Sequence, residues 1–330
     1  MSTLKRARES SLAVLHCNLP TNNKTQTPEA IDFSTQDAFH QENQGNPFKS
    51  YPAYITNPKY DVLNLTPHSS CAPFKSLTFI DDPSRIKILQ SCNGLLLCCN
   101  FRPNRLDTTY YIYNPTTKHY TPQFFQKIDP WRPSSRPFVA PSNVQFENGV
   151  FWNGAIHWVS DWGGWLCFDV EEEQMRDILM PSGDGDVRLY RYFRESGDHL
   201  HLVEVYGSDN LQFDVYEMEK DHSGWFVKYQ VDLNPVAAAF PEMVRGYADP
   251  IDLHSYAFSI LCVVHEETDE DSFMVLHLPN KARRYNFKDN SFRKLHDFAP
   301  LRSRVGVGGD SSLEFEYFDA YQFIESFACV

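Results

Sequence analysis

The chain has 330 residues and a formal net charge of −13. Nucleic acids and anionic membrane surfaces are bound through Lys and Arg, so this charge argues against either of them as a partner. Apolar residues make up 42% and aromatic residues 15% of the chain. That composition favours strands over helices, because flat rings suit a pleated, half-buried surface.

The N-terminal segment, residues 1–51, is rich in Asn, Gln, Thr, Ser and Lys and has little apolar periodicity. It buries too little surface to offset the entropy lost on ordering, so it is predicted to be a disordered or loosely docked arm. Residues 52–330 are predicted to form one domain. No signal peptide or run of eighteen apolar residues is found, which predicts a cytoplasmic location, a nuclear location or both.

From about residue 52 onward, short apolar or alternating runs are separated by Gly, Pro, Asn and Asp, which is typical of strands joined by tight turns. Asn93-Gly94, Asn153-Gly154 and Ser223-Gly224 are expected to supply the positive φ that such hairpins need. In chain order, the clearest predicted strands are 86–90, 94–100, 110–113, 149–151, 155–159, 165–169, 199–206, 211–218, 225–231, 259–265, 273–277 and 284–286.

These strands group into four loosely repeated units, each with an apolar strand, a polar gap, an aromatic-rich strand and a further strand. Tyr113, Phe168, Tyr216 and Phe287 mark equivalent positions, at intervals of 55, 48 and 71 residues. The first two intervals are near the period of about 50 residues of kelch-type blades. We therefore predict an all-β, kelch-like β-propeller of antiparallel blades, in which residues 319–326 close the ring against the first blade.

No pattern typical of an enzyme or a cofactor site occurs. Glycine-rich phosphate loops, cysteine pairs at zinc-site spacing and a serine nucleophile elbow are all missing from the sequence. His199 and His201 share one face of a predicted strand and would bind a metal if a third ligand approached, but a half-exposed strand pair is the expected arrangement. We predict no catalytic residue, no metal and no cofactor, and we expect the cysteines to be reduced, buried core residues.

Acidic residues are concentrated between residues 161 and 221, where 16 acidic and 5 basic side chains occur. Both a surface for a basic partner and a solvated acidic rim are compatible with this excess. Tryptophans in the loops of a rigid scaffold make good binding anchors. The predicted protein-binding residues are therefore Trp131 and Trp162, with Asp184 and Asp186 of the acidic turn at 182–188.

Several blocks of the sequence occur in an order that is typical of one family. They are SCNGLLLC with YYIYNPTTKHYT, then GVFWNGAIHWV with LCFDVEEEQMRDILMP, and finally AYQFIESFACV. These blocks resemble the F-box-associated domain of a large plant protein family, over roughly residues 70–330. The resemblance implies a kelch-like propeller that recruits a protein target to a cullin-RING (SCF-type) ubiquitin ligase.

Relatives of this kind typically carry an N-terminal F-box, a helical motif that docks on the Skp-type adaptor of the ligase. Residues 1–69 lack a recognisable F-box, so this adaptor is expected as a partner only if the arm holds a cryptic one. The target protein is unknown. Two alternatives stay open: a free-standing binding domain that competes with full-length relatives without coupling to ubiquitin transfer, and a β-propeller enzyme or sugar-binding lectin.

Overall fold

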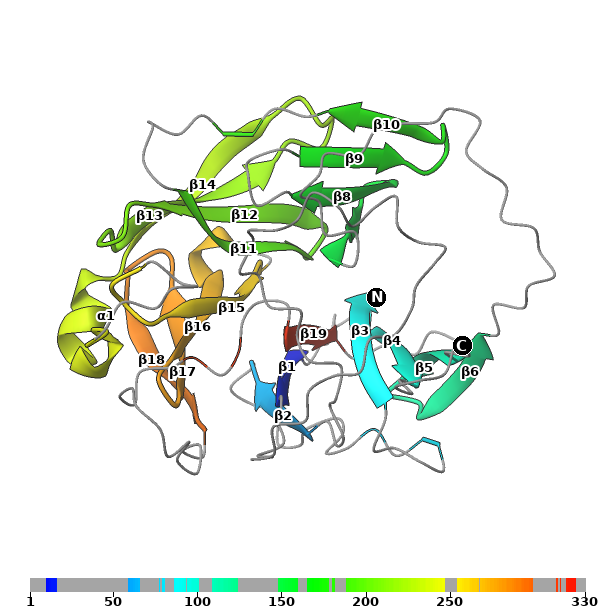
Figure 1. Ribbon diagram of the computed structural model, residues 1–330, viewed down its shortest axis with the longest axis horizontal. Helices are drawn as coiled ribbons and strands as arrows, with labels where there is room; N and C mark the ends of the chain where they lie inside the picture. The colour runs from blue at the N-terminus through cyan, green and yellow to red at the C-terminus, as the bar shows by residue number, and fades with distance from the viewer. Residues whose placement is uncertain are drawn as a thin grey trace, which may run out of the picture.

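The computed structural model of the protein consists of short antiparallel sheets around a common centre (Figure 1). It describes residues 10–16, 59–65, 77, 79–80, 86–92, 94–100, 109–123, 148–159, 165–177, 180–181, 188–246, 254–266, 268–298, 313, 315 and 319–324. Helix is scarce in these residues: α1 (Asn234–Ala239) is a six-residue helix between two of the sheets. No helix in the described part of the chain is long and apolar enough to cross a membrane.

Four of the sheets, which we call blades 1 to 4, are meanders of four consecutive antiparallel strands. Blade 1 contains β3 (Ile86–Cys92), β4 (Leu95–Asn100), β5 (Thr109–Asn114) and β6 (His119–Gln123). Blade 2 contains β7 (Val150–Trp152), β8 (Ala155–Val159), β9 (Trp165–Asp169) and β10 (Gln174–Asp177). Blade 3 contains β11 (Arg188–Ser196), β12 (His199–Tyr206), β13 (Gln212–Met218) and β14 (Trp225–Asp232). Blade 4 contains β15 (Ser259–Val264), β16 (Phe273–Leu278), β17 (Lys281–Asn286) and β18 (Phe292–Asp297).

The fifth sheet, blade 5, combines strands from the two ends of the described chain. Its order is β19 (Ala320–Ile324), β1 (Ser10–His16) and β2 (Lys59–Asn64), with β1 in the middle. Ala13 of β1 lies opposite Tyr321 on one side and Val62 on the other. The ring is therefore closed by the pairing of β1 with β19, the first and the last strand of the described chain.

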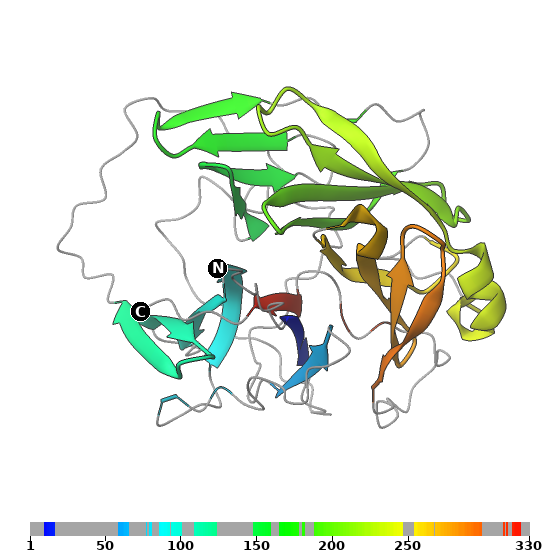
Figure 2. The same cartoon turned by 180° about the vertical axis from the view of Figure 1, so that it is seen from behind.

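The first strands of blades 1 to 4, together with β19, form the inner wall of the ring (Figure 2). They surround a narrow channel of about 70 Å³, to which they contribute Gln90, Val150, Arg194, Cys262 and Gln322. A small channel of this kind is what remains when the inner strands of a propeller pack side by side.

The hydrophobic core lies between neighbouring blades, because each blade packs its two faces against the blades beside it. Val203 of blade 3 and Met274 of blade 4 belong to one cluster of fully buried side chains. Tyr321 of blade 5 packs with Ile86 of blade 1, which shows how β19 completes the ring against the first blade, as expected from the sequence.

The predicted all-β fold with antiparallel blades is confirmed, and so is the internal repeat. Tyr113, Phe168 and Tyr216 all lie on the third strand of their blades, and Phe287 directly follows the third strand of blade 4. The structure adds strands that the sequence prediction did not contain, namely β1, β2 and β11. It also gives bounds to β6, β10 and β18, which the sequence analysis placed only as the further strand of each unit. Of these, β6 carries Pro122 and is the outermost strand of blade 1, where a residue without an N–H is tolerated.

One turn prediction is wrong, and one segment of the predicted arm is a strand. Gly94, Asn153 and Gly154 have positive φ, but in the β13–β14 hairpin the positive φ of 60° belongs to His222 and not to Gly224. Within residues 1–51, for which the sequence predicts a disordered or loosely docked arm, Ser10–His16 forms β1. The other residues of the arm lie outside the described part of the chain, and the boundary at residue 51 stays a prediction.

Candidate functional site

All four residues predicted to bind a protein, Trp131, Trp162, Asp184 and Asp186, lie outside the described residues. The binding surface that they would form stays a prediction. The described part of the chain offers a different concave surface, an open groove of about 490 Å³ on the outer strands of blade 3.

Carboxylates, phenols and amides line this groove, which we call the acidic groove. Its carboxylates are Glu204, Asp214 and Asp232, and its phenols are Tyr206 and Tyr216. Its amides are Asn210, Gln212 and Gln230 of blade 3, with Asn290 from the β17–β18 turn of blade 4. Among the lining residues whose side chains the structure describes, none carries a positive charge.

Hydrogen bonds hold the acidic groups of the groove in place. Tyr206 Oη donates to Glu204 Oε2 at 2.8 Å, and Gln212 Nε2 donates to Asp232 Oδ2 at 3.3 Å. Asp232 Oδ1 also accepts from the backbone N–H of Asn234 at 2.9 Å, and this bond lowers the pKa of Asp232. Asp232 is therefore an anion at neutral pH.

The wall of the groove is fixed by contacts between blades 3 and 4. The Tyr285 hydroxyl accepts from the backbone N–H of Asp232 at 3.2 Å and donates to Asn290 Oδ1 at 2.8 Å. Burial, and then the charges of Asp214 and Glu204, raise the pKa of Tyr216, so its phenol is a neutral hydrogen-bond donor. The groove combines negative charge with aromatic surface on rigid strands.

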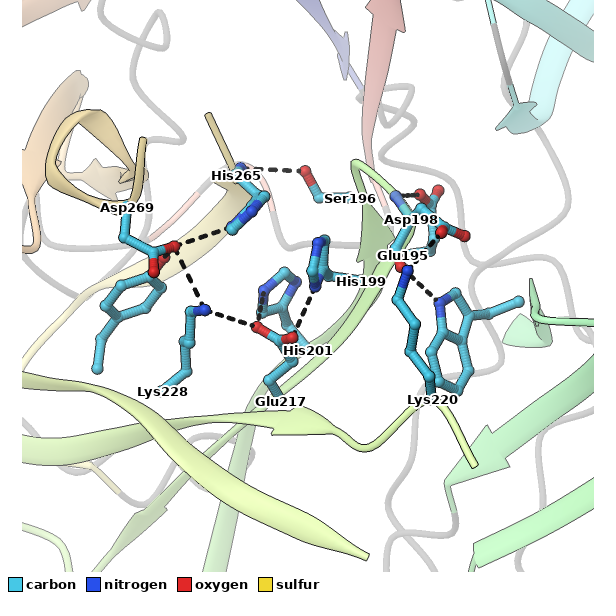
Figure 3. Close-up of polar contacts among 12 residues, drawn as sticks. Glu195, Ser196, Asp198, His199, His201, Glu217, Lys220, Lys228, His265 and Asp269 are labelled. Atoms are coloured by element: carbon cyan, nitrogen blue, oxygen red, sulfur yellow. Dashed lines mark hydrogen bonds and ion pairs between the residues drawn. The ribbon is translucent and has the colours of Figure 1, made fainter. Parts of the chain in front are cut away.

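A second polar feature lies at the contact between blade 3 and blade 4 (Figure 3). Glu217 of β13 is its centre: Oε1 lies 2.6 Å from His199 Nδ1, and Oε2 lies 3.6 Å from Lys228 Nζ. Lys228 Nζ also lies 3.3 Å from Oδ1 of Asp269, which follows β15 in blade 4. We call this network the Glu217 cluster, and it links the two blades by charge as well as by packing.

Three histidines belong to this cluster, and one of them is fully buried. His201 is 0% exposed, and its Nε2 lies 3.9 Å from Glu217 Oε2. Burial, followed by the electrostatic effects of His199, His265 and Lys228, lowers the pKa of His201 to about 3. The ring is thus neutral at physiological pH, and the predicted half-exposed strand pair is wrong for His201.

The sequence prediction paired His199 with His201, but the possible ligand atoms that come together belong to a different set, which lacks His199. Potential ligand atoms of His201, Glu217 and His265 lie within 4.8 Å of one another. The Lys228 ammonium, however, already supplies a positive charge beside Glu217. Because a metal ion would have to displace or tolerate that charge, we interpret the cluster as an ion-pair network between two blades.

The sequence contained a partial signal for these features. The acidic excess between residues 161 and 221 includes Glu204, Asp214 and Glu217, but the printed sequence does not show which of its members share a groove. His265 and Asp269 reach the cluster from another blade, so their part in it depends on the packing of blades rather than on any local pattern.

The ring of five sheets and the open groove define a β-propeller scaffold. No protein-family model matches the chain. "F-box protein At5g07610" of Arabidopsis thaliana is 34% identical over 334 aligned positions, which cover 82% of this chain and 78% of the relative. The chain therefore belongs to the plant F-box protein family.

Solved structures share only a remote likeness. Oligogalacturonate lyase from Vibrio parahaemolyticus is 11% identical, with 66% of this chain and 58% of that chain covered and a TM-score of 0.32. TolB from Acinetobacter baumannii is 10% identical, with coverage of 81% and 52% and a TM-score of 0.25. Neither likeness carries an argument about this chain.

Proposed function

We propose that the chain is a non-catalytic target-recognition subunit of an SCF-type ubiquitin ligase, and that it binds a basic segment of its target protein in the acidic groove. The proposal has two supports, membership of the F-box protein family and the chemistry of the groove. The observation that carries it is the convergence of Asp214 and Asp232 with two phenols on a concave face, above the buried carboxylate of Glu204. The described residues that line this face include no cation.

An extended segment with Arg or Lys side chains suits this surface. Carboxylates accept charge-assisted hydrogen bonds from guanidinium groups, and tyrosine rings offer faces on which a cation can lie. The fixed position of Asp232 and the neutral phenol of Tyr216 reduce the ordering that binding would require. A net charge of −13 would also steer a basic partner toward the protein.

We expect the purified full chain to bind a labelled peptide of alternating Arg and Ser more tightly than the same peptide with citrulline, the neutral isostere of Arg. Replacing both carboxylates in the variant Asp214→Asn/Asp232→Asn should weaken binding by about tenfold or more, because each change removes the negative charge and one acceptor oxygen while keeping the size of the side chain. Fluorescence anisotropy measures the dissociation constants.

The matched control is Glu171→Gln/Glu270→Gln, which changes the net charge equally at two exposed residues outside the groove. It should bind the Arg peptide almost as tightly as the parent chain. Equal losses in the two variants would mean that only the overall charge attracts the peptide, and the groove would then have no part in recognition.

The two other readings of the sequence differ in what the chain does after binding. A free-standing module would bind the same target without contacting the Skp-type adaptor. A propeller enzyme needs a pocket that encloses its substrate, and such pockets usually have volumes of about 300 Å³ or more. The central channel is smaller than this, at about 70 Å³, and the acidic groove of about 490 Å³ is open and does not enclose a ligand. We therefore propose recognition and not catalysis, and we include a kelch-like blade type and a cytoplasmic or nuclear location in the proposal.

A further inference from the structure

Three side chains with metal-binding atoms meet where blade 2 contacts the β13–β14 hairpin of blade 3. His157 of β8 and Cys167 of β9 are directly opposite each other in neighbouring strands. His222 reaches them from the hairpin, and its ring lies 5.3 Å from that of His157. Potential ligand atoms of the three residues lie within 4.8 Å of one another.

The hydrogen bonding of His157 leaves one ring nitrogen available to a metal ion. Its Nε2 lies 3.3 Å from the carbonyl oxygen of Trp152, which can only accept, so Nε2 carries the proton. The Nδ1 lone pair is buried and has no hydrogen-bond partner, in a residue that is 0% exposed. Metal-binding histidines have this arrangement, in which the second nitrogen donates to a carbonyl and fixes the ring.

His222 offers a second nitrogen in the same condition. Its Nε2 is buried without a hydrogen-bond partner. Buried polar atoms of folded proteins are nearly always paired, and a ligand shared with the neighbouring thiol would give both of these nitrogens a partner. His222 has a positive φ of 60°, the left-handed conformation that the sequence analysis expected at Ser223-Gly224. This backbone conformation sets the position of the His222 imidazole.

The hairpin and blade 2 are already joined around the three side chains. Trp152 Nε1 donates to the carbonyl of Asp198 at 3.0 Å, and Asn153 Nδ2 donates to the carbonyl of Lys220 at 2.6 Å. These bonds connect blade 2 to two turns of blade 3, so the ligands need little rearrangement to meet one ion.

The charges near this site favour a dication more than those of the Glu217 cluster do. Arg176, Asp169 and Asp221 all act on His222, and Arg176 is itself paired with Asp169 at 2.9 Å and Glu172 at 2.8 Å. Lys220 of the same hairpin is paired with Asp198 at 2.9 Å. In the Glu217 cluster, by contrast, a lysine ammonium already lies beside the carboxylate.

We propose that His157, Cys167 and His222 form a zinc site that fastens blade 2 to blade 3. Two imidazoles and one thiolate are ligands that Zn²⁺ prefers, and three protein ligands leave the fourth tetrahedral position for water. Binding would convert the Cys167 thiol to a thiolate and release its proton to solvent. This inference departs from the sequence-based expectation of no metal.

Cobalt(II) titration of the tag-free, reduced full chain after chelator treatment tests the site. We expect one equivalent of Co²⁺ to produce a thiolate-to-cobalt charge-transfer band and the visible bands of a tetrahedral ion, and one equivalent of Zn²⁺ to remove them. Cys167→Ser should abolish the charge-transfer band. His222→Asn, in which Asn tolerates the positive φ, should weaken Co²⁺ binding by more than about tenfold.

Two control variants separate this site from other donors. Cys262→Ser removes a buried thiol of blade 4, and Glu217→Gln changes the other cluster, and both should leave the spectrum unchanged. Absence of the charge-transfer band in the parent chain would overturn the proposal, as would a band that persists in Cys167→Ser or disappears in Cys262→Ser. Because the readout is spectroscopic, it is independent of target binding in the acidic groove.

Discussion

A chain that begins at residue 17 is expected to lose the cooperative thermal unfolding of the intact protein. The shortened chain lacks β1, which is the only hydrogen-bonded link between β2 and β19 in the described sheet. Without it, Leu63 and Leu65 lose the sheet that holds them in the core beside blade 4. Burial of a leucine contributes about 1.5–3 kcal/mol, so two of them represent a large part of a total stability of about 5–15 kcal/mol.

Differential scanning calorimetry of the two chains measures this effect. A matched variant keeps β1 but replaces residues 18–57 with a short Gly-Ser turn. Such a turn fits because His16 and Lys59 lie opposite each other at the ends of antiparallel β1 and β2. We expect the turn variant to unfold in one transition like the parent chain. If the chain that begins at residue 17 unfolded at the parent temperature, closure of the ring by β1 would be wrong.

Replacement of Glu217 by alanine should destabilise the protein by about 3–5 kcal/mol, because it leaves Lys228 and His199 without their shared carboxylate at a buried position. The Glu217 side chain is only 8% exposed, so water cannot take the place of the carboxylate without entering the contact between blades. Urea unfolding, with the midpoint and slope compared between variant and parent, gives the change in the free energy of unfolding.

The control for this change is Asp269→Ala, which removes another carboxylate that contacts Lys228. Asp269 is 59% exposed, and exposed ion pairs contribute at most about 1 kcal/mol. A large difference between the two variants is therefore expected. If Glu217→Ala were as mild as Asp269→Ala, the cluster would be solvated and would not fasten blade 3 to blade 4.

Strand positions could be predicted where apolar residues dominate a run. The predicted strands 155–159, 165–169 and 199–206 have the bounds of β8, β9 and β12. In contrast, β11 carries Arg188, Arg191 and Arg194 among its aromatic residues, and β1 is a short apolar run within a polar segment. The sequence prediction missed both strands, because it relied on the apolar pattern of neighbouring residues. Whether such a run forms a strand depends instead on its pairing with a strand that is distant in the sequence.

The Glu217 cluster and the proposed zinc site could not be predicted from the sequence alone. Both depend on how neighbouring blades pack against each other. Alternation in His199–Tyr206 suggests one buried and one exposed face, yet a blade between two others is covered on both, and β12 is buried along most of its length. Likewise, Cys167 and His222 come together through the packing of two blades. Local periodicity reports that a residue lies on a strand but not what covers it.

Co-elution of the chain with a purified Skp-type adaptor in size-exclusion chromatography tests the central claim, that this propeller links a target to a ubiquitin ligase. A chain that begins at residue 52 would lose β1 as well, so the turn variant lacking residues 18–57 is the appropriate comparison. Because coupling to the ligase requires a cryptic F-box in the arm, we predict that the full chain elutes together with the adaptor, whereas the turn variant, which lacks residues 18–57, elutes separately but remains folded. If the full chain also eluted apart from the adaptor, the claim would be contradicted, and the protein would be a free-standing binding module.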